Sequence, residues 1–181
     1  LTNEENNGLI KTMRKLCSEK NCKNEVELTW RKLIQMFVLV ATNSGLRVGE
    51  QKQLRWKDIR VEMHKDKDDN TVKLARIGVR AATSKVRKGR TLLYRNGQYF
   101  ERIQELFGKR DEKDLIFSID GKRTINLKTL NKYFRVMLEE AKIADVAGRS
   151  IALYSLRYFM ITQRIMAGLN YRKLRTCVEQ V

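Results

Sequence analysis

The chain has 181 residues, enough for one well-buried domain, and 42% of them are apolar, a share that argues against extended disorder. Its formal net charge of +17 comes from 38 lysines and arginines against 21 acidic residues. This surplus predicts a polyanionic partner. Nucleic acid is the first candidate, with a basic protein of a ribonucleoprotein particle or a membrane surface as alternatives. The sequence has no apolar run near the ~18 residues of a membrane span and begins without a signal-peptide core, so neither is predicted.

The cysteines do not predict a metal site. Cys17, Cys22 and Cys177 are an odd number without metal-ligand spacing, and His64, expected at the surface, is the only histidine. Free thiols suit a reducing compartment, so we expect a cytoplasmic protein, at the nucleoid or, if viral, in the host cytoplasm. The first residue is not methionine, which is typical of a piece of a longer protein.

The first part of the chain has helical periodicity. Apolar residues spaced at helical intervals predict helices over residues 9–17, 27–42 and 47–54, with a loop over residues 21–24. The second of these is the strongest, because it carries apolar residues along one continuous stripe. Ser44-Gly45 predicts the break between the second and third helices.

The middle of the chain predicts a small antiparallel sheet. Strands are expected over residues 60–62, 71–79 and 91–94. The first two are separated by a charged turn over residues 64–70, and the last two by a basic hairpin tip over residues 84–90.

The last part returns to helices, predicted over residues 97–107, 127–141, 150–167 and 171–176, with Gly168 ending the third. The whole therefore predicts a mixed α+β fold, mainly α-helical with a three-stranded antiparallel sheet, in a single domain over residues 1–181.

Arg47 follows the Ser44-Gly45 break, and Glu50 lies three residues later on the same helical face. A guanidinium beside free backbone N–H groups at a helix start is a good anion receptor. An ordinary salt bridge between Arg47 and Glu50 is the alternative, and the pair alone does not decide between the two.

Two further cations could complete a phosphate site. Lys85 lies at the expected hairpin tip, and Arg157 lies on a late helix three residues after Tyr154. Phosphoryl transfer needs several cations around the equatorial oxygens of one phosphate, and arginine engages two oxygens at once. The alternative for Lys85 is a solvated loop cation among several.

Three stretches together resemble the catalytic domain of the tyrosine recombinase (phage integrase) family. NSGLRVGEQKQLRWKDI is similar to the family's TGLRxxEL and LxWxDI box, and ATSKVRKGRTLL to its β-hairpin lysine stretch. YSLRYFMITQRIMAGLN is similar to its HxLRHxxAT helix ending in glycine. The resemblance extends from about residue 9 to residue 176, with the three boxes in the family's order and spacing.

The resemblance implies a role for each matching residue. Arg47 and Arg157 would clamp the scissile phosphate, Lys85 would protonate the departing 5′ oxygen, and Glu50 would be a supporting carboxylate. Tyr154 stands where the family usually has histidine. A phenol can donate a hydrogen bond to phosphate but is a poor base near pH 7, because its ordinary pKa is ~10.

The end of the chain departs from the family. Tyr158 replaces a second histidine, and both Tyr158 and Tyr171 lie too early to be the nucleophile, so we expect them to pack in the core or at the surface. The family's later histidine or tryptophan and its nucleophilic tyrosine would both fall after Val181, and the stretch after Cys177 is compressed. We therefore expect a piece that lacks the nucleophile and the N-terminal core-binding domain, and that is inactive alone.

The resemblance implies site-specific recombination or integration of double-stranded DNA for a phage or mobile element. The intermediate would be a 3′-phosphotyrosyl link, which conserves the bond energy, so no metal or nucleotide cofactor is expected. The full-length enzyme would be a homotetramer on DNA and this piece a monomer. Contacts with the DNA backbone are expected from two groups of cations, in the hairpin and near a helix start: Arg87, Lys88, Arg90, and Lys122, Arg123, Lys128.

Two alternatives stay open. The second group of cations could be a solvated face. The chain could also be a non-catalytic DNA-binding module that keeps the fold, which the replacement at Tyr154 favours. An RNA-binding protein is a weaker alternative, because no aromatic-rich strand offers a stacking platform.

Overall fold

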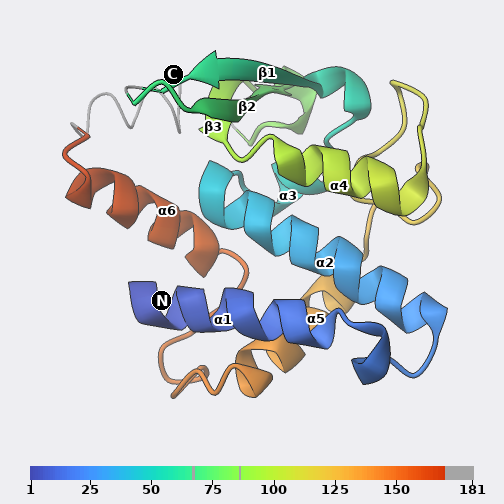
Figure 1. Ribbon diagram of the computed structural model, residues 1–181, viewed down its shortest axis with the longest axis vertical. Coiled ribbons are helices and arrows are strands. Elements are labelled where there is room, and N and C mark those ends of the chain that lie inside the picture. Colours follow the sequence, from blue (N-terminus) through green and yellow to red (C-terminus); the bar gives the residue numbers. More distant parts are fainter. Residues whose placement is uncertain (67, 86, 170–181) are drawn as a thin grey trace.

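The computed structural model describes residues 1–66, 68–85 and 87–169. A three-stranded sheet lies across one side of a group of helices, and α2 runs through the middle of that group (Figure 1). The mixed α+β class predicted from the sequence is confirmed.

Helix α1, Asn3–Leu16, begins six residues before the predicted start at Leu9. The reason is a capping box: the Thr2 hydroxyl accepts a hydrogen bond from the Glu5 amide (3.2 Å), and the Glu5 carboxylate accepts one from the Thr2 amide (2.8 Å). The Thr-x-x-Glu spacing of this cap is visible in the sequence and had been overlooked.

Helix α2, Glu25–Ser44, is the centre of the core. Its residues from Leu33 to Ala41 are all buried, because the sheet and α4 cover one side while α1 and α5 cover the other (Figure 1). Asn24 caps its start, and Gly45, in the left-handed region at φ 62°, ends it.

Helix α3, Val48–Lys52, is shorter than the predicted span to Leu54. The amides of Gln53 and Leu54 donate three residues back, to the carbonyls of Glu50 (3.1 Å) and Gln51 (3.2 Å), so the four-residue spacing of an α-helix is not continued. A single 3-10 turn, Trp56–Asp58, then leads into the sheet.

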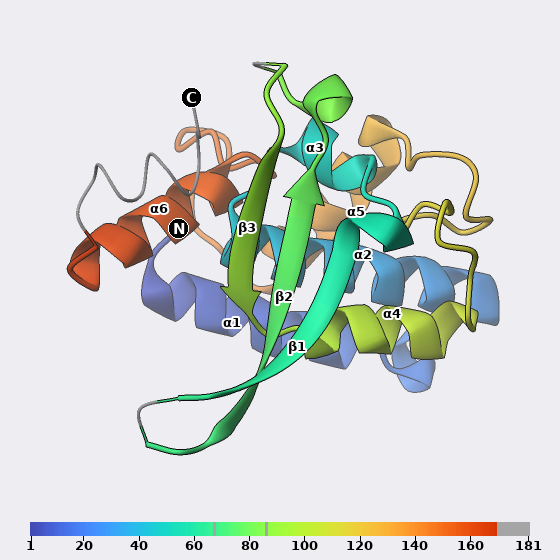
Figure 2. The same cartoon turned by 90° about the horizontal axis from the view of Figure 1, so that it is seen from above.

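The sheet consists of β1 (Ile59–Lys65), β2 (Thr71–Val79) and β3 (Arg90–Arg95), antiparallel and in that order. Strand β2 has the predicted bounds, whereas β1 is longer at both ends and shortens the charged turn. Seen from above, the β1–β2 hairpin extends beyond the helices, and the connection from β2 to β3 lies at the opposite end, over α3 (Figure 2).

Three helices complete the fold: α4 (Gln98–Phe107), α5 (Leu127–Glu140) and α6 (Ser155–Met166). The prediction that the last of these begins at Ser150 is wrong. Ser150 has φ 50° and its amide bonds back to the Ala147 carbonyl in a tight turn, so the helix starts five residues later. Gly168, at φ 82°, follows its end as predicted, and the helix predicted over residues 171–176 lies outside the described residues. Within the described part of the chain, none of the helices combines the length and apolar character that crossing a bilayer requires.

Candidate active site at the start of helix α3

The corner between α2 and α3 places Arg47 beside helix α6. Gly45 forms the corner, and a Cβ added there would meet the Met160 side chain of α6 at 1.9 Å, so only glycine fits without rearrangement. Arg47 is the N-cap residue of α3, as predicted. Because α3 has only five residues, its N-terminal N–H groups do not make an anion site by themselves. The chemistry of the corner depends on the side chains that gather there.

A buried carboxylate lies at the centre of this corner. The Glu50 side chain is 1% exposed and accepts from the Arg47 amide (3.0 Å) and from the Arg47 guanidinium (3.3 Å). Arg90 binds both oxygens through its two terminal nitrogens, at 3.0 and 2.7 Å. Burial by itself would raise the pKa of Glu50, but the hydrogen bonds from Arg90 and from the Arg47 amide outweigh it, and the pKa is lowered.

Arg157 enters the same corner from α6. It is 4% exposed and donates a hydrogen bond to the carbonyl of Gly45, 112 residues earlier in the chain. Burial lowers the pKa of Arg157, and the nearby charges of Arg47 and then Arg90 lower it further. Among the described residues, two guanidiniums thus bond to one carboxylate and a third lies beside them on a backbone carbonyl, which leaves a surplus of positive charge suited to an anion.

Tyr154 and Tyr158 form the exposed side of the corner. Tyr154 precedes the first turn of α6, is 44% exposed, and lies close enough to Arg157 to influence its pKa. The two rings meet edge to face with centroids 5.1 Å apart. Of the two packing sites expected for Tyr158, the core or the surface, the structure shows the surface, since Tyr158 is 60% exposed and its ring contacts Tyr154.

Lys85 is exposed in the connection between β2 and β3. Among the described residues its ammonium makes no hydrogen bond or ion pair, so the structure brings Arg47 and Arg157 together but does not bring Lys85 into contact with either. The connection itself lies over α3 (Figure 2). Arg87 and Lys88 are exposed in the same connection.

Arg90 differs from the exposed hairpin cation that was expected. It is the first residue of β3, its side chain is 2% exposed, and it points inward on the same face as Leu92 and Tyr94. This period-of-two pattern is a signal that could have revealed its burial from the sequence. A buried arginine bonded to Glu50 is part of the interior and not a flexible loop cation.

The second group of expected DNA contacts lies away from this corner. Lys122 pairs with Asp114, and Arg123 pairs with Asp120 at 2.6 Å, both on the loop before α5. Lys128 is exposed in the first turn of α5. All three are open to solvent, and the first two already have carboxylate partners.

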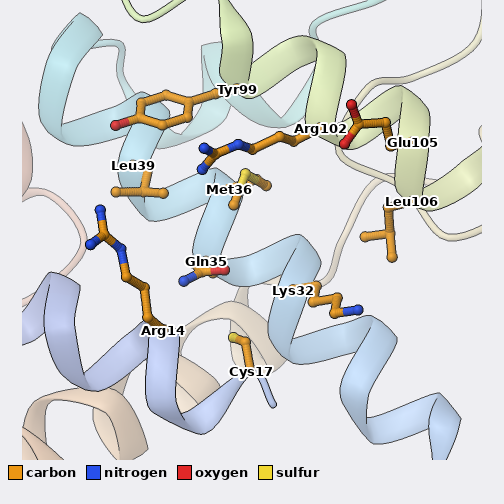
Figure 3. Close-up of a pocket in the computed structure, with 10 residues that line it drawn as sticks. All are labelled: Arg14, Cys17, Lys32, Gln35, Met36, Leu39, Tyr99, Arg102, Glu105 and Leu106. Atoms are coloured by element: carbon orange, nitrogen blue, oxygen red, sulfur yellow. The ribbon is translucent and has the colours of Figure 1, made fainter. Parts of the chain in front are cut away.

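Hollows lie at several places on the surface of the described part of the chain. An open groove of about 720 Å³ runs beside the β2–β3 connection, and another of about 410 Å³ runs along α5. A third, of about 540 Å³, lies between α1, α2 and α4 (Figure 3) and shares no residue with the corner around Glu50. Within the described ranges, no three His, Cys, Asp or Glu side chains are grouped to hold a metal ion.

The sequence model of the phage integrase family matches this chain over residues 1–178. The chain therefore belongs to the phage integrase family, the tyrosine recombinases.

The solved structures that share its fold include two of one protein. Both are of the XerH site-specific recombinase, one bound to palindromic difH substrate in a post-cleavage complex and one bound to difH substrate in a pre-cleavage complex. Each superimposes with a TM-score of 0.70 at 16% sequence identity and covers 98% of this chain. This chain in turn spans only 45% and 46% of those chains. No curated protein sequence matches it.

Proposed function

We propose that this chain is the catalytic domain of a tyrosine-type site-specific recombinase that cleaves and rejoins double-stranded DNA. The observation that carries the proposal is that Arg47 and Arg157 lie in one corner, where Arg47 bonds to the buried Glu50 carboxylate and Arg157 bonds to the carbonyl of Gly45, two residues before Arg47. Two guanidiniums at this corner can neutralise the charge that develops on the oxygens of a phosphodiester during displacement.

In the proposed reaction a tyrosine oxygen attacks the phosphorus and the bond from phosphorus to the 5′ oxygen breaks. Lys85 gives its proton to that leaving oxygen, and the strand is held as a 3′-phosphotyrosyl ester. Attack by the 5′ hydroxyl of another strand then breaks the phosphotyrosyl bond and returns the tyrosine. Tyr154 donates a hydrogen bond to a non-bridging oxygen, and Glu50 keeps Arg47 oriented.

The DNA partner is supported by where cations line the grooves. The groove beside the β2–β3 connection contains Lys57, Arg60 and Arg76, and Arg87 and Lys88 lie on the connection itself. The groove along α5 contains Lys128, Lys132 and Arg135. With a net charge of +17, these side chains would supply salt-dependent affinity for the DNA backbone, and Lys122 and Arg123 would add to it from the neighbouring loop.

The nucleophile, in this proposal, is not among the six tyrosines of the printed sequence. Tyr94 is buried in the core, Tyr99 lines the cleft between α1, α2 and α4, and Tyr133 stacks near Trp30 with ring centroids 6.3 Å apart. Tyr154 and Tyr158 belong to the phosphate corner, and Tyr171 lies outside the described residues. The 181 residues would then form one DNA-binding domain, monomeric by itself and part of a homotetramer on DNA in the cytoplasm.

Two substitutions test the catalytic assignment in the full-length protein, whatever extends beyond these residues. We expect Arg47→Ala and Arg157→Ala each to slow covalent attachment to a nicked duplex about 100- to 1,000-fold, because each removes a stabilising donor. Arg95→Ala is the matched control, since Arg95 is exposed at the far end of β3. Cleavage at the wild-type rate in both variants would refute the assignment and favour a non-catalytic DNA-binding module.

The 181-residue chain provides a second test. On a nicked duplex we expect a salt-sensitive shift in gel mobility and no band that survives denaturation. A covalent protein–DNA band would show that one of the six tyrosines is the nucleophile.

A further inference from the structure

The connection that carries Lys85 is anchored to α3 at both of its ends. At the first end, Arg80 follows β2 and donates through Nη2 to the carbonyl of Gln53, the residue that ends α3, at 2.6 Å. Its Nε donates to the Asp58 carboxylate at 3.2 Å, and that carboxylate also accepts from the Arg55 amide at 2.9 Å. The Arg80 side chain therefore fixes the end of β2 to the segment directly after α3.

At the second end, Arg90 begins β3 and holds both oxygens of Glu50, at 3.0 and 2.7 Å. The same carboxylate holds the Arg47 amide and guanidinium. One buried carboxylate thus joins the end of the Lys85 connection to the residue that would bind phosphate. The Nε of Arg90 and the hydroxyl of Ser84, which directly precedes Lys85, are buried without a hydrogen-bond partner among the described residues.

Between these two anchors the hydrogen bonds of the described residues stay within the connection. The amides of Thr83 and Ser84 donate to Arg80, and the Arg87 amide donates to the Ser84 carbonyl. The position of Lys85 relative to α3 is consequently set by the two arginine anchors, since these are the bonds that leave the connection.

We propose that Arg80 and Arg90 are positioning residues that hold Lys85 in register with Arg47. The proposal rests on the function proposed above. A general acid must lie within hydrogen-bond reach of the leaving oxygen, and a displacement of about 1 Å can cost about 100-fold in rate. Arginine is required at both places because its planar fork fixes direction as well as charge, which the single ammonium of lysine does not.

The test uses a leaving group that needs no proton. In a duplex whose scissile 5′ oxygen is replaced by sulfur, the departing thiolate is a far weaker base than an alkoxide, so cleavage no longer depends on a general acid. In the full-length protein we expect Arg80→Lys to cleave ordinary DNA roughly 10- to 100-fold more slowly and to recover most of that loss on the sulfur substrate. Lys85→Ala should recover in the same way, and Arg47→Ala should not.

Arg90→Lys should recover only in part, because Arg90 also supports Glu50 and through it Arg47. Arg95→Lys, at the opposite end of β3, should cleave both substrates at the wild-type rate. An unchanged rate for Arg80→Lys, or an equal loss on both substrates, would overturn the proposal. If Arg47→Ala cleaves normally, it is the proposed function that fails, and if Lys85→Ala does not recover, it is the assignment of Lys85.

A second measurement on the 181-residue chain does not depend on cleavage. We expect Arg80→Lys and Arg90→Lys to speed hydrogen exchange at the amides of Thr83, Ser84 and Arg87, while the amides of β2 exchange as in the wild type. Unchanged exchange at those three amides would equally overturn the proposal, since the anchors would then not hold the connection.

Discussion

Two regions of the molecule each gather three cations, and they do so in opposite ways. Around Glu50 the guanidiniums of Arg47, Arg90 and Arg157 are wholly or largely buried and are fixed by named hydrogen bonds. In the cleft between α1, α2 and α4 three cations from these helices are among the side chains that line the hollow (Figure 3). They are Arg14, Lys32 and Arg102, and none forms an ion pair with another described residue.

The cleft still brings charges near one another. Burial raises the pKa of Tyr99, and the nearby guanidiniums of Arg102 and Arg14 oppose that rise. Arg102 also lies 6.0 Å from the centre of the Tyr99 ring. Water screens these exposed charges, so their geometry is weakly determined. The difference shows that the number of cations does not define a site, whereas burial and hydrogen bonds to fixed partners determine where each cation points.

The largest effect should come from breaking the buried pair. Arg90→Met leaves the Glu50 carboxylate buried without its main partner, and we expect a loss of about 3–5 kcal/mol in the free energy of unfolding measured with urea. The double variant Glu50→Gln with Arg90→Met removes both charges and should be clearly more stable than Arg90→Met alone. A double variant as unstable as the sum of the two single ones would contradict the assigned pairing.

The second-largest effect also concerns the Glu50 carboxylate, and it should appear as a loss of unfolding free energy when the pH is lowered. The pKa of Glu50 is lowered on folding, so its contribution is fully present above the ordinary carboxyl value near 4.5 and is lost as the pH falls towards the lowered value. The pKa of Glu5 is also lowered, to about 2, first by the side-chain hydrogen bond from Arg149 and then by the hydrogen bond from the Thr2 amide. Glu5 therefore also loses its contribution to the unfolding free energy as the pH falls below 4.5. Comparing the wild type with Glu50→Gln isolates the contribution of Glu50, because both proteins contain Glu5.

Between pH 5 and 3 the wild type should therefore lose more unfolding free energy than Glu50→Gln does. Parallel curves for the two proteins would show that Glu50 titrates normally in the folded chain. Arg14→Ala is the control for this measurement, because its cleft lacks a buried carboxylate, and it should follow the wild type.

The smallest effect should come from the cleft itself. Arg14→Ala and Arg102→Ala each remove an exposed cation without a carboxylate partner, and we expect changes within about 0.5 kcal/mol, with any stabilisation fading in 1 M salt. Thermal unfolding at low and high salt measures this. A loss of several kcal/mol from either variant would mean that the cleft cations are as firmly held as those around Glu50.

Local patterns predicted the elements better than the site. Period-of-two alternation located β2 within its observed bounds, and a glycine break located the corner at Gly45. The starts of α1 and α6 were misplaced, because they are set by a capping box at Thr2 and by a tight turn at Ser150 instead of by apolar spacing. These are local signals, and the first of them is readable in the sequence.

The site needed information that local patterns do not contain. The meeting of Arg47 with Arg157 was expected from the family resemblance alone, since periodicity carries nothing about contacts between distant segments. The burial of Arg90 was missed because a charged side chain in a basic stretch is ordinarily exposed. Its partner, Glu50, lies 40 residues earlier and becomes apparent only when β3 is laid against α3.

The hydrogen bond from Arg157 to the Gly45 carbonyl has a consequence for the order in which the protein becomes competent. A ribosome that has translated as far as residue 150 has already made the sheet, the corner that carries Arg47 and, among the described residues, every α-helix except α6. The second guanidinium, that of Arg157, has not yet been translated, and its hydrogen bond to the Gly45 carbonyl joins residues 112 positions apart. A polypeptide that ends before α6 would thus have Arg47 and Glu50 at the corner but not the guanidinium of Arg157 beside them, so the full surplus of positive charge at the corner forms last.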